Sequence, residues 1–412
     1  MRRDSSSKVL IIDADNRLGG RVHTVSNNYG DLIEFGPMRI LDTHTHTLDL
    51  CKQYDIPLVI FNDNFNHSPI YFTSKQYDCT KSLDKSISMH EFMYRHFCEF
   101  YDFPFFDYEF VPLVNNLIIR DLFKYGLTIL TCSFEKFVTL FFSKVQQDIL
   151  WTLFPYDHLH KCPVSLSECL ETFLHPQSFK SYRPLNGFSS IISSLSAAFH
   201  HSGGLSLLKS KVKTIQKIDD QYSVCTQPKN SYTSSQIFFA IPPSCVLLIS
   251  GISSLLPDDI IKYLKSIGHY SSQKSFYTFT QQSEISLLQN YDGFFRTSYP
   301  NRIGHWNPCV SSLKHKTLLA SYNSFSSSDI NYLPFLNSVL PFDLSTPSAV
   351  ISFDWKNSIS GLSAHFWIPG SFDYSESNRL NSFSDSLFFV GEAYCQHHGW
   401  IESALLSTKQ IF

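Results

Sequence analysis

Charged residues are scarce in this sequence, and neither sign dominates. Asp, Glu, Lys and Arg make up 17% of the 412 residues, and the formal net charge is only −3. Because there is no large basic field, nucleic acid is a poor candidate for a partner. Hydrophobic residues account for 43% of the chain, which is typical of a globular rather than a disordered protein.

Long apolar runs are also absent. The run after the charged N-terminus covers only Val9–Ile12, which is too short for a signal peptide. The uncharged stretch Ser235–Pro257 contains Pro242-Pro243 and several serines, so it is better interpreted as a strand followed by a turn. We expect no membrane span. The cytoplasm is the default location, although the sequence does not fix the compartment.

Closely paired cysteines of the metal-binding type are missing. The 10 cysteines are scattered from Cys51 to Cys395, and Cys162 and Cys169 are too far apart for the usual ligand pair. We therefore expect free thiols. A chain of this length is too large for one ordinary core, so two or three domains are expected.

The apolar pattern predicts strands and helices in alternation, and hence an α/β protein. The expected strands are 8–13, 210–215, 222–227, 235–240 and 386–390, and the expected helices are 44–54, 191–195 and 399–412. Residues 89–174 carry apolar residues at helical spacing, including Phe92, Phe97 and Phe100, which predicts a mainly helical block. Residues 275–366 mix strands and loops.

Glycine is absent from the residues that precede Asp13. A dinucleotide-binding fold has a glycine-rich turn after its first strand, and an acid at the end of its second strand for a ribose hydroxyl. The acid normally lies about 20 residues after the glycines. Asp13 ends a predicted strand, but none of the 12 residues before it is glycine. The phosphate-binding loop is therefore absent from this chain.

The segments that follow resemble the FAD-dependent amine oxidases. Asp13-Ala-Asp-Asn-Arg17-Leu-Gly19-Gly20-Arg21 matches the segment after the second strand of that family. Glu34-Phe-Gly36-Pro37-Met38-Arg39 is similar to a loop of its L-amino-acid oxidases. The resemblance implies that Asp13, Ala14 and Arg21 bind the cofactor and that Gly36, Pro37 and Met38 lie along the flavin. It also implies that Arg39, beside the flavin, grips the substrate carboxylate, which suits a planar, bidentate guanidinium.

A closing segment carries the strongest match. Gly391-Glu392 is followed by Gly399-Trp400-Ile-Glu-Ser403, at the family's separation. The resemblance implies that Glu392 bonds the ribityl or pyrophosphate part of FAD, and that Gly399 and Trp400 touch both flavin and substrate. The start of the closing helix would face the flavin's pyrimidine edge, where a helix N-terminus stabilises negative charge. The residues concerned are Ile401, Glu402, Ser403 and Ala404.

Metal binding and covalent flavin are both disfavoured near this segment. His397 and His398 are adjacent, and adjacent residues on a strand point to opposite faces, so we expect no metal. Monoamine oxidases attach flavin at a cysteine upstream of the motif, but the corresponding stretch 358–363 has none. Non-covalent FAD is expected.

Four weaker matches lie in order through the middle of the chain. Residues 183–188 resemble the family's lead into a helix, with Asn186 in place of one glycine. By resemblance, Val212 contacts the adenine, Lys274 lies near flavin N5 as the catalytic lysine that holds a water, and Tyr299 gives the substrate carboxylate a second hydrogen bond. The resemblance runs from Lys8 nearly to the C-terminus.

The implied activity is oxidative deamination of L-amino acids to 2-oxo acids, with release of ammonia and hydrogen peroxide. The partners would be an amino acid and oxygen; a homodimer is one option, since the sequence leaves the oligomeric state open. The resemblance implies a Rossmann-like domain without its first strand and glycine loop, a mixed-sheet substrate domain and a helical domain. The expected bounds are 1–42, 181–240 and 372–412 for the FAD domain, 43–88 and 241–371 for the substrate domain, and 89–180 for the helical domain.

Several alternatives stay open because the glycine loop is absent. The true protein could start upstream, the lost element could come from another chain, or the gene could be decaying. Two rival functions are a catalytically dead binding or structural protein and an oxidase of amines that lack a carboxylate. The main interpretation requires both ends of the chain to converge on one isoalloxazine, with a slot for its three rings between Arg39 and Trp400.

Overall fold

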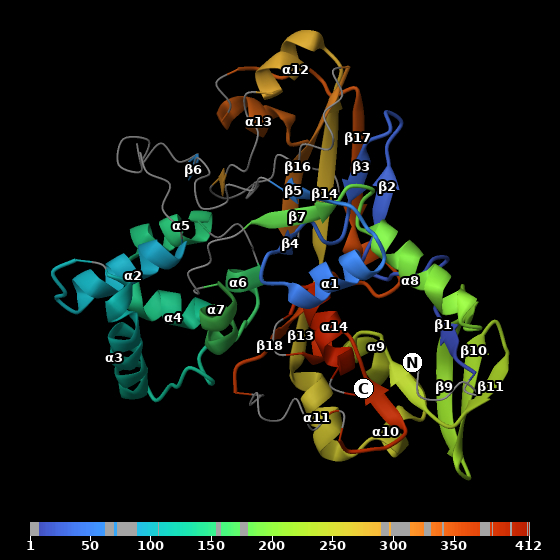
Figure 1. Ribbon diagram of the computed structural model, residues 1–412. Helices are drawn as coiled ribbons and strands as arrows, with labels where there is room; N and C mark the ends of the chain where they lie inside the picture. The colour runs from blue at the N-terminus through green and yellow to red at the C-terminus, as the bar shows by residue number, and fades with distance from the viewer. Residues whose placement is uncertain are drawn as a thin grey trace.

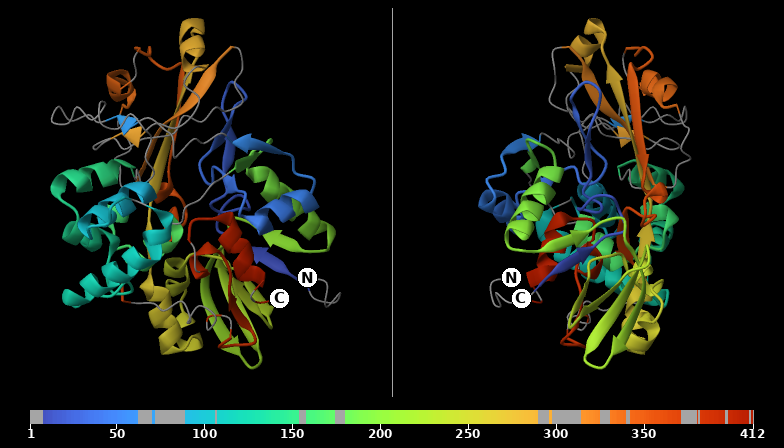
Figure 2. Two further views of the ribbon diagram at one scale, coloured as in Figure 1. Left: turned by 60° about the vertical axis from the view of Figure 1, so that its left-hand side comes forward. Right: turned by 90° about the vertical axis from the view of Figure 1, so that its right-hand side faces the viewer.

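The fold combines a block of helices with several small sheets (Figure 1). The computed structural model describes residues 8–61, 70–71, 89–105, 107–153, 158–173, 180–289, 296–297, 314–324, 331–339, 342–370, 380, 382–395, 398–409 and 411. In both views of Figure 2, one long sheet extends above the rest of the molecule.

Two pairs of parallel strands form in the lower part of the molecule. They are β1 (Leu10–Ile12) with β8 (Leu205–Leu207), and β12 (Ile237–Phe239) with β19 (Leu387–Phe389). Across the second pair, the rings of Phe239 and Phe389 stack with centroids 5.1 Å apart. The strands predicted at the front of the chain, before Pro242 and near the C-terminus are therefore confirmed.

The burial of β1 differs from the expectation. The sequence predicts a strand buried on both faces, but Leu10 and Ile11 are 37% and 36% exposed. Among the described residues, β1 has a neighbouring strand on one side only, and Ile12 alone packs against a core. An apolar run indicates a buried strand only when other elements cover both of its faces.

An antiparallel meander and three short helices complete the core beneath the parallel pairs. These elements are β9 (Lys211–Ile218), β10 (Gln221–Gln227), β11 (Ser231–Ser234), α9 (Pro243–Leu247), α10 (Ile252–Leu255) and α11 (Asp258–Ser266). Tyr222, Val224 and Thr226 alternate inward along β10, as a strand period of two requires. The two strands predicted at 210–215 and 222–227 are confirmed.

A three-stranded antiparallel sheet forms the long upper part. Its order is β16 (Lys316–Ser324), β14 (Ser272–Phe279), β17 (Ala349–Asp354), and the helices α12 (Gln282–Gln289) and α13 (Leu333–Val339) lie at its far end (Figure 1). All eight residues of β14 are buried, because strands flank it on both edges. At its base, β13 (Ile267–Tyr270) pairs with β18 (Ala364–Trp367).

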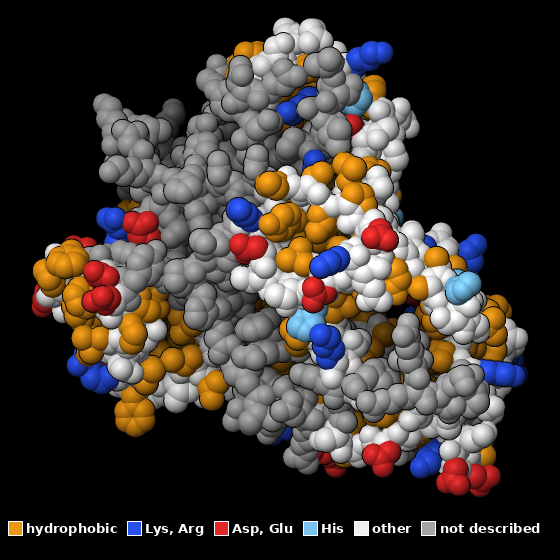
Figure 3. Space-filling view, in the orientation of Figure 1, with side chains coloured by type: hydrophobic (Ala, Val, Ile, Leu, Met, Phe, Trp, Pro, Cys, Tyr) orange, Lys and Arg blue, Asp and Glu red, His pale blue; other side chains and the backbone are white. Residues whose placement is uncertain are grey.

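The described residues between 89 and 173 form helices, as the sequence predicts for the block 89–174. Its helices are α2 (Met89–Phe100), α3 (Val111–Lys124), α4 (Phe134–Phe141), α5 (Lys144–Leu153), α6 (His158–Lys161) and α7 (Leu166–Phe173), with η2 (Tyr108–Phe110) before α3. Phe97, Phe134 and Phe137 lie at its centre with exposures of 0 to 1%. On the face seen in Figure 3, hydrophobic side chains also gather on the outside of this block.

The described part of the chain has further short elements. They are β2 (Thr24–Ser26), β3 (Leu32–Glu34), β4 (Ile40–Leu41), α1 (Thr45–Gln53), β5 (Leu58–Phe61), β7 (Ser181–Pro184), α8 (Ser189–His201), α14 (Ile401–Lys409), the pair β6 (Ile70–Tyr71) and β15 (Arg296–Thr297), and the short turns η3 (Trp355–Asn357) and η5 (Glu392–Tyr394). The predicted helices at 44–54, 191–195 and 399–412 correspond to α1, α8 and α14.

The chain therefore has the mixed helix and sheet content expected of an α/β protein. The Rossmann-like details and the three domain bounds stay predictions. None of the helices in the described parts of the chain is long and apolar enough to cross a membrane.

Replacing a central aromatic of the helical block should destabilise the fold. Phe137 is fully buried between Phe97 and Phe141, with ring centroids 5.6 and 5.2 Å away. We expect Phe137→Ala to lower the free energy of unfolding by about 3–5 kcal/mol, because it removes buried surface and leaves a cavity. Phe123→Ala, at a ring that is 77% exposed, is the control and should change it by less than about 0.5 kcal/mol. Urea denaturation measures both, and equal effects would contradict this packing.

Candidate functional site

The turn after β1 is held by its own arginine. Gly19 and Gly20 adopt φ of +103° and +53°, which favour glycine. The Arg17 guanidinium donates to the carbonyl oxygens of Val22 and Gly20 at 2.9 and 2.5 Å. The Arg17 side chain therefore holds the turn. The side chain of Arg21 instead extends from the turn to residues of the C-terminal part of the chain.

Asp13 lies where its strand ends, close to the start of β9. Its Oδ1 accepts from the Asp15 amide at 2.8 Å, and its carbonyl accepts from Ser210 at 2.9 Å. Burial raises the pKa of Asp13. Val212 is two residues after Ser210, and its side chain packs on the same core as Ile12. Two residues predicted at the adenosine end of a cofactor, Asp13 and Val212, are thus near each other.

The two predicted cofactor-binding segments at the front are in direct backbone contact. A Cβ placed on Gly36 would lie 2.0 Å from the Arg21 carbonyl oxygen, so only glycine allows this approach. The side chain of Glu34, two residues before Gly36, contacts a different segment. Its carboxylate accepts from the Phe188 amide at 2.9 Å and from the Thr24 hydroxyl at 2.8 Å, which joins the loop to the start of α8.

Lys274 reaches the same loop from β14. Its Nζ donates to the carbonyl oxygens of Gly36, at 2.5 Å, and Glu34, at 3.2 Å, and lies 5.0 Å from the centroid of the Tyr322 ring. Burial lowers the pKa of Lys274 to about 7, although the charge of Glu34 opposes the shift. An ammonium buried among carbonyl oxygens thus lies against the segment predicted to line the flavin.

Arg39 and Trp400 meet although 361 positions separate them in the numbering. The Arg39 guanidinium carbon lies 5.8 Å from the Trp400 ring centroid. His44 packs edge-on against the same indole, with centroids 4.7 Å apart. Burial lowers the pKa of His44 to about 4, with Glu402 opposing the shift and Arg39 adding to it, so this imidazole is neutral near pH 7.

The expectation of a ring slot between Arg39 and Trp400 is wrong in this arrangement. A flat ring held between two groups needs about 7 Å, twice the contact distance of carbon atoms. At 5.8 Å the guanidinium and the indole are already in contact. A flavin at this site would have to lie beside the pair rather than between its members.

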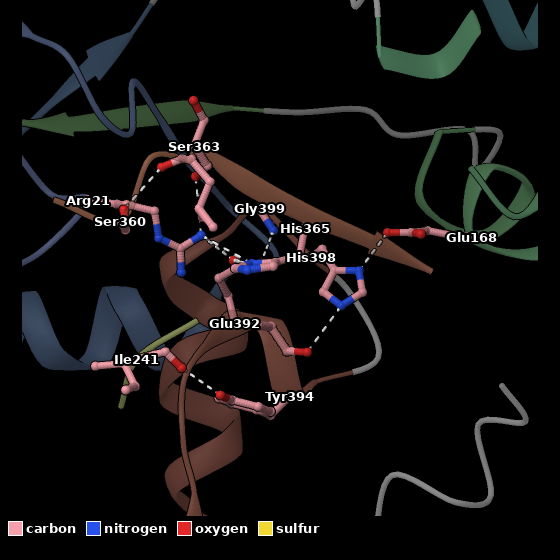
Figure 4. A network of polar contacts seen from close by, with 12 residues as sticks. Arg21, Glu168, Ile241, Ser360, Ser363, His365, Glu392, Tyr394, His398 and Gly399 are labelled. Carbon is pink, nitrogen blue, oxygen red and sulfur yellow. Dashed lines mark hydrogen bonds and ion pairs between the residues drawn. The ribbon is translucent and has the colours of Figure 1, made fainter. Parts of the chain in front are cut away.

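Glu392 is the centre of a buried polar network (Figure 4). Its Oε1 accepts from Arg21 Nη1 and lies 2.5 Å from His365 Nδ1, and its Oε2 accepts from the Gly399 amide at 2.7 Å. Arg21 also donates to the Ser363 carbonyl oxygen at 3.1 Å. Burial alone would raise the pKa of Glu392, but Arg21 and His365 hold it well below its usual range. The carboxylate is therefore ionised and draws three segments together.

His398 links this network to the helical block. Its Nδ1 lies 2.8 Å from Glu168 Oε1 on α7, and the other oxygen of Glu168 accepts from the Trp367 amide at 2.6 Å. Burial would lower the pKa of His398, but Glu168 raises it above its ordinary value. His397 lies outside the described residues. Within those that are described, no three His, Cys, Asp or Glu side chains group to hold a metal.

The other predicted site residues differ in burial and in the contacts that they make. Pro37, Met38, Ala14 and Ala404 are partly buried near the segments above, while Ser403 is buried. The Glu402 carboxylate accepts from the His46 amide at 3.0 Å and from the Thr47 amide and hydroxyl, both at 2.8 Å, so it caps α1 and any cofactor contact of this residue would use its backbone. Ile401 packs against the core beneath α1. Tyr299 lies outside the described residues.

The described residues fit a flavin nucleotide. A Cβ on Gly399, where φ is +84°, would meet open space, which leaves its backbone approachable. Nε2 of the buried His365 has no hydrogen-bond partner within the described parts of the chain, so this nitrogen is available to a bound molecule. Arg21 supplies a fixed positive charge for a phosphate, and Lys274 borders the loop beyond it.

Sequence reasoning missed three residues of this site. His44 and His365 flank predicted site residues, and Glu168 holds His398, but none belongs to a quoted motif. The sequence signal for His44 is its position at the start of a predicted helix, shortly after Arg39. No sequence signal distinguishes His365 from the chain's other histidines.

Comparison with known proteins agrees with the resemblance. The family model described as flavin containing amine oxidoreductase matches residues 3–410. The chain is also 34% identical over 70 residues to a Bacillus subtilis (strain 168) protein named "Putative L-amino-acid oxidase YobN". That alignment covers 16% of this chain and 14% of the relative.

Lys274 should make stability depend on alkaline pH. Because its folded pKa of about 7 lies below the unfolded value of about 10.4, the unfolded state binds more protons between these values. We expect the free energy of unfolding of the wild type, relative to Lys274→Met, to rise from pH 7 to 10 with a slope approaching about 1.4 kcal/mol per pH unit. Urea titrations across this range measure the slope. Lys144→Met, at a side chain 80% exposed, controls for the lost charge, and parallel curves for wild type and Lys274→Met would contradict the assignment.

Proposed function

The chain belongs to the flavin-containing amine oxidoreductase family, and on that premise we propose that it binds FAD without a covalent bond and oxidatively deaminates L-amino acids. The products are 2-oxo acids, ammonia and hydrogen peroxide. The same premise leads us to assign the FAD, substrate and helical domains to the bounds given by the sequence.

One observation carries this proposal: the segments that hold Arg39 and Trp400, from opposite ends of the chain, meet, so that a flavin would lie beside this pair rather than between its members. The guanidinium is 5.8 Å from the indole centroid. The residues just before Arg39 touch Lys274 and Arg21, and the residue just before Trp400 is held by Glu392. The motifs attributed to substrate and cofactor therefore share one region of the molecule, as a single flavin site requires.

A bound flavin would supply the hydride acceptor, and oxygen would be the oxidant that returns it to the oxidised form. The protein's own task is to bind and orient the substrate. Arg39 holds the carboxylate through paired charge-assisted hydrogen bonds, with Tyr299 as a second donor. Trp400 walls the amino side. Because His44 is neutral, it adds no second cation that would compete for the carboxylate.

The cofactor contacts are assigned here from the adenosine end of FAD to its flavin ring. Asp13, Ala14 and Val212 hold the adenosine end, and Arg21 faces the pyrophosphate. Glu392 orders Arg21 and the Gly399 backbone around the ribityl region. Gly36, Pro37 and Met38 would hold the flavin ring together with the start of α14, from Ile401 to Ala404. Lys274 would be the catalytic lysine and would hold a water beside the flavin.

Flavin binding and reduction test the proposal directly. The purified full chain, incubated with FAD and desalted, should retain a yellow flavin spectrum. Under anaerobic conditions that spectrum should bleach with one or more L-amino acids of a panel and not with their D-enantiomers, because Arg39 and Tyr299 fix one face of Cα. A chain that takes up no FAD would favour a binding or structural protein instead.

Replacing Arg39 separates amino acids from simple amines as substrates. Charge-assisted hydrogen bonds contribute about 1.5–3 kcal/mol each, so Arg39→Met should reduce kcat/KM for the best L-amino acid by about 100-fold or more. Turnover of the matching decarboxylated amine should barely change. Peroxide release measures both. Arg95→Met, at an exposed surface arginine, is the control, and an equal loss on amine and amino acid would argue against a carboxylate-binding role.

A further inference from the structure

His365 is an unassigned histidine at the centre of the buried network. It lies on β18 with a side chain only 1% exposed. Its Nδ1 lies 2.5 Å from Glu392 Oε1 and 3.4 Å from Arg21 Nη1 (Figure 4). One side of the imidazole is thus fixed by the two residues predicted to hold the cofactor.

The neighbours of His365 determine which nitrogen carries the proton. Glu392 is ionised and can only accept, so Nδ1 must be the donor in this contact. Burial lowers the pKa of His365 to about 4, despite the opposing charge of Glu392, so the ring is neutral near pH 7. A neutral ring with its proton on Nδ1 presents a lone pair at Nε2.

That lone pair has no partner among the residues that the structure describes. A buried acceptor without a donor is costly, and such a group in a native protein calls for an explanation. Arg21 cannot supply the donor at Nε2, because its guanidinium is engaged by Glu392 and Ser363 on the Nδ1 side. A bound molecule that carries a hydroxyl group can supply this donor.

We propose that Nε2 of His365 accepts a hydrogen bond from a hydroxyl group of the flavin's ribityl chain. This inference rests on the proposed function. Glu392 connects His365 to Gly399, and Gly399 precedes Trp400, so the network lies toward the ring end of the cofactor. Asp13 and Val212, at the adenosine end, take no part in it. A ribityl chain offers several hydroxyl donors, and the neutral imidazole provides the matching acceptor.

Two isosteric replacements separate the two nitrogens. In His365→Asn the amide nitrogen can replace Nδ1 toward Glu392, but nothing replaces Nε2. In His365→Gln the amide oxygen can replace Nε2 as the acceptor. We expect His365→Asn to weaken FAD and FMN binding by about tenfold, the factor for one lost hydrogen bond, and His365→Gln to stay within about threefold of wild type. Flavin fluorescence titration of the flavin-free full chain measures both.

The control is His269→Asn, which changes the exposed residue opposite His365 in the β13–β18 register and should leave binding unchanged. FMN carries the ribityl chain without the adenosine. A loss seen with FAD but not with FMN would overturn the ribityl assignment. Full binding by His365→Asn with weak binding by His365→Gln would also overturn it, since His365 would then only support Glu392.

Equal binding by both variants and the wild type would sink this inference while leaving the proposed function intact. A wild-type chain that binds no flavin would sink both. Should His365→Asn fail to fold, ¹⁵N-histidine spectra of the wild type give the answer. The Nε2 signal of His365, identified by its loss in His365→Gln, should shift on addition of FMN, and an unchanged signal would overturn the proposal.

Discussion

The site depends on one buried carboxylate. Glu392 is 6% exposed and ionised, and a buried charge persists only when it is paired and fully hydrogen-bonded. Arg21, His365 and the Gly399 amide satisfy it from three segments far apart in the chain. Together, two side chains and one backbone amide compensate this buried charge. The position of Arg21 and the backbone before Trp400 are therefore set by this carboxylate.

A second constraint is the close contact of two backbones. Gly36 lies against the Arg21 carbonyl oxygen at a distance that no side chain would allow. Lys274 then closes the loop by donating to Gly36 and Glu34. Because Glu392 holds Arg21 and Gly36 holds the loop against Arg21, the position of Arg39 follows from that of the buried network. The contact between Arg39 and Trp400 completes the connection from the other side.

Burial also sets the charge states in this region. It holds His44 and His365 neutral and brings Lys274 close to its midpoint at neutral pH. Arg21 and Arg39 stay cationic because guanidinium does not deprotonate in proteins. The result is a region whose fixed positive charges suit the anionic groups of a nucleotide and an amino acid. His398 and Glu168 connect this region to the helical block through a buried hydrogen bond between their side chains.

The sequence by itself determined the local structure and the family. Short apolar runs ending at Asp13, Pro242 and Gly391 predict β1, β12 and β19 correctly, because the spacing of apolar residues is a local property. The helical period likewise predicts the helical block over residues 89–174. The motifs at Arg21, Arg39 and Trp400 indicated a flavin site because their residue types and spacings carry chemistry.

Only the tertiary structure decided which of these residues meet. Arg39 lies against Trp400 with no room for a ring between them, and β1 is partly exposed. The Glu402 side chain caps α1 by accepting hydrogen bonds from its first residues. The tertiary structure also brought His44, Glu168 and His365 into the site. Such contacts join segments that are distant in the chain, and their energies come from burial and pairing, which depend on the packing of the whole molecule and have no signature in local sequence.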